Sequence, residues 1–92
     1  MIKSFRHKGL QLFFETGKKT GIQASHAGRL RMQLAALDSA ITVNDMRIPG
    51  YRLHRLKGRS KKRRSIWVSG NWRLTFEFDR GDVSILDYED YH

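Results

Sequence analysis

The chain has 92 residues, a length that predicts a single domain over residues 1–92 with a modest core. Its 18 lysines and arginines outnumber 9 aspartates and glutamates, and the net charge of +9 points to a polyanionic partner. The absence of cysteine excludes disulfides and thiol catalysis, and four scattered histidines are a poor ligand set for zinc, so no metal or other cofactor is expected.

The start of the chain predicts a short strand and a helix. Residues 2–5 alternate apolar and polar side chains, as in an edge strand. Residues 9–16 have helical spacing, and Gly17 is typical of a helix end. The apolar stripe of this helix comprises Leu10, Phe13 and Phe14. His7 is expected to be exposed.

Residues 23–40 predict a longer amphipathic helix of about 14 to 16 residues. Its core-facing stripe follows the spacing i, i+4, i+7 and i+11 and comprises Leu30, Leu34, Leu37 and Ile41. His26 is expected to be exposed on this helix. Residues 42–50 include Pro49 and Gly50 and predict a connection that the helix cannot enter.

The second half of the chain changes to the period of strands. Residues 51–56, 65–68, 72–78 and 83–88 predict strands separated by turns. Along residues 72–78 the apolar positions face one side, whereas Arg73 faces away from the core. The predicted fold class is therefore α+β, with two N-terminal helices packed on a mostly antiparallel sheet of about four to five strands.

Charge is segregated along this half. Residues 77–92 contain six acids against Arg80 alone, and they follow a segment that contains no acid. That segment, residues 47–64, holds half of all the positive charge, a pattern typical of phosphate contacts, with a solvated basic surface as the alternative. Its cations are Arg47, Arg52, Arg55, Lys57, Arg59, Lys61, Lys62, Arg63 and Arg64.

Four motifs in order resemble one protein family. They are Leu53-His54-Arg55-Leu56-Lys57-Gly58, Ser65-Ile66-Trp67-Val68, Asn71-Trp72-Arg73-Leu74-Thr75-Phe76 and Asp87-Tyr88-Glu89-Asp90-Tyr91-His92. They are similar to the motifs of the HigB toxins, a branch of the RelE superfamily of ribosome-dependent mRNA interferases. The resemblance implies a RelE-like fold, a catalytic cleft on the concave side of the sheet, and a small helix-turn-helix antitoxin, HigA, as partner. It also implies that the complex represses its own operon, with the operator DNA contacted mainly by the antitoxin.

RNA cleavage without a metal is possible when the 2'-hydroxyl of the substrate attacks the adjacent phosphate. His92 is the first choice for general acid or base because its ordinary pKa of about 6.5 lies near cellular pH. Asp90 is two residues away and would orient it in an extended segment. Lys57 and Arg73 are expected on the scissile phosphate, with Lys57 as a point charge or a base. The alternative for residues 90–92 is a solvated polar tail.

Other candidates complete the expected site. His54 is a second titratable imidazole, Tyr91 would stack on a base or carry a proton, and Asn71 would hydrogen-bond a base edge or simply form a turn. Which of these groups is the acid and which the base stays open. The unbroken cationic run is expected to bind the backbone of ribosomal RNA or mRNA rather than react; it comprises Lys61, Lys62, Arg63 and Arg64.

Three hypotheses from different classes follow. The first is a toxin that acts as a ribosome-dependent endoribonuclease on mRNA in the decoding site. The second is a non-catalytic RNA- or DNA-binding module, which explains the charge but gives no reason for the histidines. The third is an interaction protein whose basic middle holds an acidic partner. The chain has no run of 18 apolar residues and no signal-like segment, so no membrane is expected and a cytoplasmic location is predicted.

Overall fold

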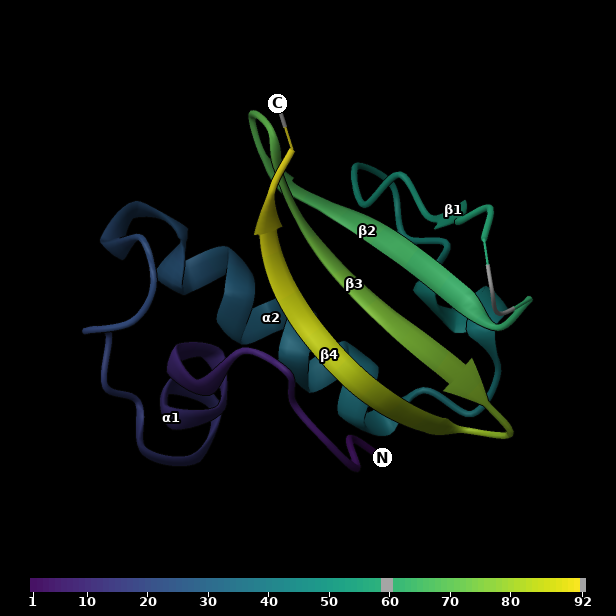
Figure 1. Cartoon of the computed structure of the whole chain (residues 1–92), viewed down its shortest axis with the longest axis horizontal. Helices are drawn as coiled ribbons and strands as arrows, with labels where there is room; N and C mark the ends of the chain where they lie inside the picture. Colours follow the sequence, from purple (N-terminus) through teal and green to yellow (C-terminus); the bar gives the residue numbers. More distant parts are fainter. Residues whose placement is uncertain (59–60, 92) are drawn as a thin grey trace.

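The computed structural model describes residues 1–58 and 61–91 and confirms an α+β fold (Figure 1). Within these ranges, two α-helices and two short 3-10 helices accompany a sheet of four strands. The elements in chain order are α1 (Lys8–Thr16), η1 (Ala24–His26), α2 (Ala27–Ser39), η2 (Val43–Met46), β1 (His54–Arg55), β2 (Arg63–Ser69), β3 (Trp72–Asp79) and β4 (Asp82–Asp90).

The strands lie side by side in the order β1-β2-β3-β4, and each neighbouring pair is antiparallel. The predicted edge strand at residues 2–5 is wrong, because these residues make only isolated parallel bridges to β4, at Ile2 and Phe5. The predicted strand at residues 51–56 shrinks to the two residues of β1. The cause is local, since Gly50 and Arg52 adopt φ angles of 88° and 50°, outside the range of a strand.

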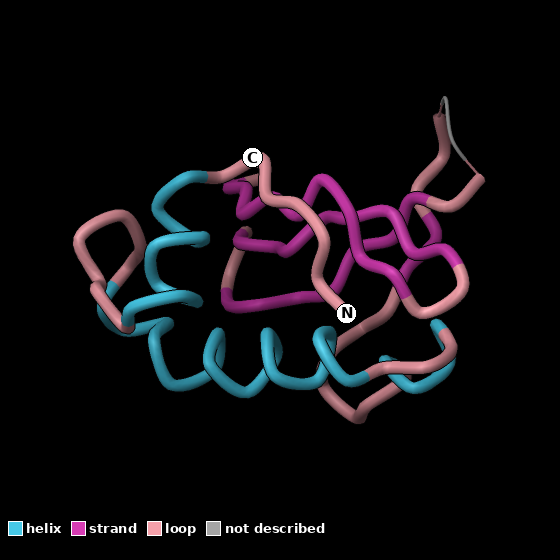
Figure 2. The backbone as a smooth tube through the Cα atoms, turned by 90° about the horizontal axis from the view of Figure 1, so that it is seen from below, coloured by secondary structure: helices cyan, strands magenta, loops and turns pink. Residues whose placement is uncertain are grey.

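Alternation along β3 separates the two faces of the sheet. Leu74 and Phe76 are fully buried against the helices, whereas Arg73 and Glu77 are half-buried on the opposite face. Figure 2 shows α2 running along one side of the strands, with α1 beside their left-hand end. Hydrophobic burial therefore fixes which side chains of the sheet remain available for polar chemistry.

The two α-helices follow the sequence prediction closely. Leu10 and Phe13 are the buried residues of α1, whereas Phe14, predicted on the same stripe, is 38% exposed. Gly17 ends the helix at a φ of 81° with its N–H donating to the Phe13 carbonyl at 2.8 Å. In α2 the stripe of leucines is buried as predicted. The prediction that Ile41 continues this buried stripe is wrong, because the helix ends at Ser39 and leaves the Ile41 side chain 78% exposed.

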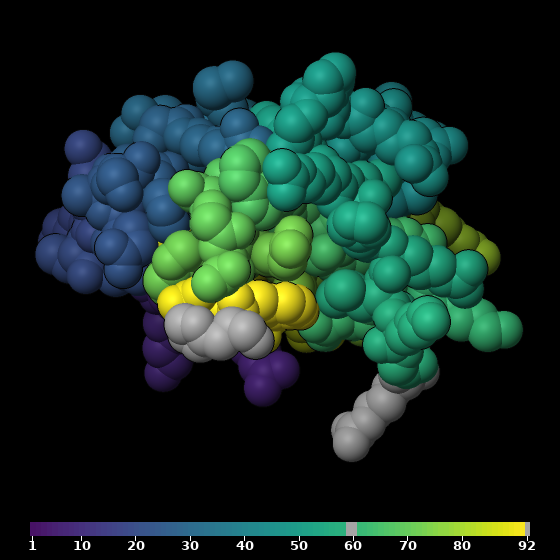
Figure 3. Space-filling view, turned by 90° about the horizontal axis from the view of Figure 1, so that it is seen from above, coloured from purple at the N-terminus to yellow at the C-terminus, as the bar shows by residue number. Residues whose placement is uncertain are grey.

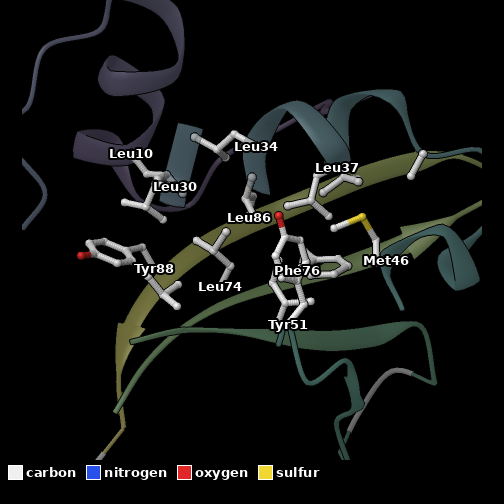
Figure 4. Packing of buried hydrophobic residues seen from close by; sticks show 14 of the residues in the cluster. Leu10, Leu30, Leu34, Leu37, Met46, Tyr51, Leu74, Phe76, Leu86 and Tyr88 are labelled. Atoms are coloured by element: carbon white, nitrogen blue, oxygen red, sulfur yellow. The ribbon is translucent and has the colours of Figure 1, made fainter. Parts of the chain in front are cut away.

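The core lies between α2 and the sheet, and Figure 4 shows its side chains meeting from both layers. η2, which the sequence did not predict, places Met46 in this core with no exposed area. A capping box starts η2: the Thr42 side chain accepts a hydrogen bond from the Asp45 backbone N–H, and the Asp45 side chain accepts one from the Thr42 backbone N–H. The Thr42 and Ile41 backbone N–H groups lower the pKa of Asp45.

His26 and His7 are not exposed, which corrects the prediction for both. His26 is 9% exposed, and its Nδ1 shares a hydrogen bond of 2.5 Å with the Tyr88 hydroxyl. His7 is half-buried, and its Nδ1 accepts from the Leu10 N–H at 2.9 Å, so it caps α1. The Trp72 ring stacks on Tyr88 with centroids 4.4 Å apart, and His26 meets both rings edge-on. These aromatic contacts join α1, η1, β3 and β4.

Burial of His26 predicts a loss of stability in mild acid. Desolvation lowers the pKa of His26 below its ordinary 6.5, so the folded state holds the neutral imidazole. The contribution of the neutral His26 to the free energy of unfolding is therefore intact above pH 6.5. It is lost as pH falls, because the unfolded chain takes up the proton more readily than the folded one. Urea unfolding at pH 7.5 and 5.5 should show a smaller acid loss for His26→Gln than for wild type. His54→Gln, which removes an exposed histidine, is the control, and equal losses in all three proteins would contradict the prediction.

Close packing of two glycines gives a second prediction for stability. A Cβ at Gly9 would lie 2.7 Å from both the Cα and the carbonyl oxygen of Gly21, inside contact distance to backbone. Gly9→Ala should therefore destabilise the fold by about 1 to 3 kcal/mol, the usual cost of overpacking. Gly28→Ala is the matched control, since a Cβ at Gly28, in α2, would meet nothing within 4 Å. This substitution should raise the free energy of unfolding by up to about 1 kcal/mol, because alanine has the higher helix propensity. Denaturant midpoints measure both effects, and shifts of the same sign would overturn the prediction.

Candidate active site

A cleft of about 510 Å³ opens on the face of the sheet opposite the helices. Its position follows from Arg63 on β2 and Glu77 on β3, which are register partners and both line it. The end of β4, the segment after β1 and the first residues of the chain complete its walls. The lining residues are Arg6, Leu56, Lys57, Gly58, Arg63, Glu77, Ile85 and Tyr91.

Four of the predicted site residues meet around this cleft. Lys57, Arg63 and Tyr91 line it directly. The Arg73 guanidinium carbon lies 5.7 Å from the centroid of the Tyr91 ring, so it reaches the same place from β3. Three cations and a phenol from β2, β3, the segment after β1 and the end of β4 therefore surround one opening.

Tyr91 is held by its backbone and perturbed by its neighbours. Its N–H donates to the Asn71 carbonyl at 2.8 Å, so the β2–β3 turn fixes the end of β4. Burial raises the pKa of Tyr91, and the charge of Glu89 raises it further, whereas Arg63 and Arg73 act in the opposite direction. The phenol is thus protonated at neutral pH and can donate a proton or a hydrogen bond.

Asn71 lies in the β2–β3 turn and is exposed. The turn role that the sequence left open is present, since its carbonyl is the acceptor for Tyr91. Figure 3 shows this green turn beside the yellow end of β4, with the teal segment that follows α2 on the other side. The Asn71 backbone therefore adjoins Tyr91, and a base contact by the Asn71 side chain stays a prediction.

Carboxylates that the sequence analysis did not select accompany the cations. Glu89 is the register partner of Arg73 and accepts a hydrogen bond from the Thr75 hydroxyl. Asp87 lies 3.8 Å from the Nε of Arg6, which brings the start of the chain to the cleft. The period of two along β4 relates these acids to Tyr91 and is the signal that would have found them. No local pattern indicates Arg6, because its partner is 81 residues away.

Two further predicted catalytic residues, His54 and Asp90, lie apart from this cluster. His54 is exposed on β1 opposite Ser65, the neighbour of Thr75, and so stands on the same face at the sheet edge. Asp90 is opposite Trp72, whose ring packs toward the helices. Burial is the main cause that raises the pKa of Tyr88, and the charge of Asp90 raises it further. His92 lies outside the described residues.

The basic run divides between several surroundings. Arg63 lines the cleft, whereas Arg64 is opposite Phe76 and its Nη1 donates to the Lys61 carbonyl at 2.6 Å. Lys62 pairs with Asp79 at 2.9 Å, and this hydrogen bond lowers the pKa of Asp79. Lys61 is exposed and borders a neighbouring hollow of about 480 Å³, together with Arg55, Leu56, Lys57 and Gly58. Arg59 lies outside the described residues.

The described residues contain neither a metal-ligand cluster nor a membrane-spanning helix. Among residues 1–58 and 61–91, no three histidine, aspartate or glutamate side chains are grouped as a metal site would require. In the same ranges, neither α-helix has the length and apolar character needed to cross a membrane.

The arrangement suits a phosphate group with a developing negative charge. Guanidinium groups bind phosphate oxygens in pairs, an ammonium adds a point charge, and a protonated phenol supplies a hydrogen or a stacking face. Glu77 and Glu89 are the register partners of Arg63 and Arg73, so negative charge adjoins two of these cations on the sheet. Proton transfer and charge stabilisation are therefore available within one opening.

Comparison with known proteins agrees with this chemistry. Residues 3–92 match the family HigB-like toxin, described as the RelE-like toxin of type II toxin-antitoxin system HigB. The chain is 48% identical over 92 residues to Endoribonuclease HigB of Proteus vulgaris, with all of both chains covered. It is 36% identical over 94 residues to Toxin HigB-1 of Vibrio cholerae serotype O1, covering 100% of this chain and 98% of that one. Since the match includes the helices, the sheet and every wall of the cleft, the chain belongs to the HigB-like family of RelE-like toxins.

Proposed function

We propose that this chain is the toxin of a type II toxin-antitoxin pair and a ribosome-dependent endoribonuclease that cleaves translated mRNA in the decoding site. The observation that carries the proposal is the cluster of Lys57, Arg63 and Arg73 around Tyr91 in one cleft. Family membership supports it, because the Proteus vulgaris relative is named an endoribonuclease. Such cleavage stops translation, which makes the protein toxic.

The proposed reaction needs no metal or cofactor, because the nucleophile is part of the substrate. The ribose 2'-oxygen loses its proton to a base and attacks the adjacent phosphorus, while the 5'-oxygen leaves and takes a proton from an acid. The products are a 2',3'-cyclic phosphate and a 5'-hydroxyl. Arg73 and Lys57 stabilise the charge of the phosphorane in this proposal, and Arg63 extends their reach along the strand.

Proton transfer is assigned to the titratable groups near the end of β4. His92 acts as acid or base and Asp90 orients it, with the assignment resting on residue chemistry and spacing. Tyr91 lies beside Arg73 in the cleft, and it carries a proton or stacks on a base. His54, exposed at the edge of the same face, contacts the strand as it leaves the cleft.

The partners in this proposal are a HigA-type helix-turn-helix antitoxin, the ribosome with its mRNA and rRNA, and operator DNA through the antitoxin complex. Lys61, Lys62 and Arg64, with Arg63, supply the positive surface for RNA backbone. The site of action is the cytoplasm, where the ribosomes are.

Primer extension on translated and untranslated transcripts tests the proposal. Cleavage within codons of the translated transcript alone supports a ribosome-dependent enzyme. Tight RNA binding with no cleavage of either transcript would favour the alternative, a non-catalytic RNA- or DNA-binding module. The antitoxin is tested separately. If a reading frame next to this gene encodes a helix-turn-helix protein, its co-expression should relieve growth arrest.

Loss of the Arg73 fork should remove most of the cleavage. Arg73→Ala should raise the barrier by about 2 to 4 kcal/mol, as for the removal of one preorganised charge-stabilising group. Arg73→Lys should recover only part of the rate, because an ammonium cannot bind two phosphate oxygens in parallel. Arg80→Ala, in the exposed β3–β4 turn, is the matched control and should cleave at the wild-type rate. Single-turnover cleavage on programmed ribosomes measures these rates, and full activity of Arg73→Lys would contradict the proposed fork.

Removal of the His92 imidazole should abolish toxicity. His92→Ala should slow cleavage by about 100-fold or more, the usual scale for a general acid or base, and His92→Gln should be nearly as slow. Thermal unfolding and antitoxin binding should be nearly unchanged in both variants. If His92→Ala still arrests growth at the wild-type rate, proton transfer belongs to His54, Lys57 or Tyr91 instead.

A further inference from the structure

We propose that Arg52, which lies over the Trp67 ring, is a second RNA-binding position that binds a phosphate of the RNA backbone beside the cleft. This inference rests on the proposed function in one respect, namely that the ligand is RNA. The group is separate from the cationic run at residues 61–64, and it comes from the turn that precedes β1.

The Arg52 guanidinium lies over an aromatic ring. Its central carbon lies 4.3 Å from the centroid of the Trp67 ring, the shortest of the cation–ring distances among the described residues. Trp67 itself is fixed, since its Nε1 donates to the Gly70 carbonyl at 2.8 Å. A planar guanidinium on an indole keeps its N–H groups directed outward in the plane of the stack.

The turn that carries Arg52 is built to keep it there. Arg52 has a φ of 50°, a conformation that costs energy for a side chain of this kind and persists only where its surroundings impose it. Tyr51 is buried in the core, and its carbonyl accepts from the Trp67 N–H at 2.7 Å. Arg52 is thus placed between a buried anchor and the start of β1.

Arg29 secures the same turn from α2. Its Nη2 donates to the Gly50 carbonyl at 2.8 Å, and its central carbon lies 5.2 Å from the ring centroids of both Tyr51 and Trp67. One half-buried arginine therefore connects a helix, a turn and a strand beside the indole. Its positive charge also adds to the local potential without being the group that faces solvent.

Arg52 has donors to spare. It is exposed, and within residues 1–58 and 61–91 no acceptor is hydrogen-bonded to its guanidinium. A cation that is preorganised and unoccupied in this way matches the paired oxygens of a phosphate. Because its rotamer is already restricted by the stack, binding costs less entropy than it would for a mobile surface lysine.

The position of Trp67 relates this group to the cleft. Trp67 is the register partner of Arg73, and directly opposite residues have their Cβ atoms about 5 Å apart on one face. Arg73 in turn lies over Tyr91. Arg52, Trp67, Arg73 and Tyr91 thus form a row in which cations and rings alternate. An RNA strand whose scissile phosphate lies at Arg73 would place a neighbouring phosphate near Arg52.

Arg52→Asn tests the inference, since asparagine tolerates positive φ and removes the guanidinium without new strain. Arg80→Asn is the control, because Arg80 is also exposed and has a φ of 53° in a turn. Binding to mRNA-programmed ribosomes is measured by sedimentation over a range of salt, which requires no cleavage. Arg52→Asn should weaken binding by about 10-fold or more and lower the salt slope by about one. Arg80→Asn should change the affinity less than about twofold, as for an uninvolved surface residue.

A second arm identifies the source of the phosphate. If it belongs to mRNA, Arg52→Asn should bind ribosomes without mRNA as well as wild type does, and if it belongs to ribosomal RNA the loss should persist there. Arg52→Lys should keep the salt slope but recover only part of the affinity. Unchanged affinity and slope in Arg52→Asn would overturn the inference, as would a loss confined to antitoxin binding. If the protein did not cleave RNA, these binding measurements would still test the role of Arg52, because none of them depends on turnover.

Discussion

The alternation of side chains along β3 is the constraint on which the rest of the molecule depends. Leu74 and Phe76 have no exposed area, and their burial against the helices determines the register of β2 and β4. A slip of one residue would place Arg73 and Glu77 in the core, at a cost far above that of any surface change. The same hydrophobic contacts that stabilise the fold therefore also hold the cations of the cleft.

The polar face has its own requirement, because it contains a fully buried hydroxyl. Thr75 has no exposed area although it lies between Arg73 and Glu77, and its hydroxyl is satisfied by Glu89. Glu89 thereby has two roles, since it is also opposite Arg73 and raises the pKa of Tyr91. The acids of β4 thus reduce repulsion among the cations.

Local pattern was enough to predict the helices and the long strands. Spacing of apolar residues and Gly17 located α1 and α2, and alternation located β2, β3 and β4. Errors arose where tertiary contacts decide the outcome. Ile41 continues the helical spacing but falls after the helix end, and His26 looks like a surface residue but hydrogen-bonds a tyrosine 62 positions away.

The candidate site was predictable to the extent that its residues are neighbours in the sheet. Lys57, Arg63, Arg73 and Tyr91 were selected from their chemistry, and the structure brings them together. Arg6 and Glu89 were missed, because one comes from the start of the chain and the other is recognised only once β4 is paired with β3. Asp90 shows the limit of spacing alone, since the sheet turns it toward Trp72 while Tyr91 faces the cleft.

The two borders of the sheet are finished in different ways, and this affects what can attach to them. Residues 1–6 run along residues 83–86 of β4 and occupy outer backbone groups there, with the Lys3 N–H donating to the Val83 carbonyl at 2.7 Å and the Leu86 N–H to the Ser4 carbonyl at 3.1 Å. A covered border cannot template the stacking of further chains, which protects a small basic protein from fibre-like association. The opposite border consists of β1, only two residues long and flanked by cations. A partner strand that extends the sheet would therefore meet a short, positively charged border, where an acidic segment is favoured over a second copy of this chain.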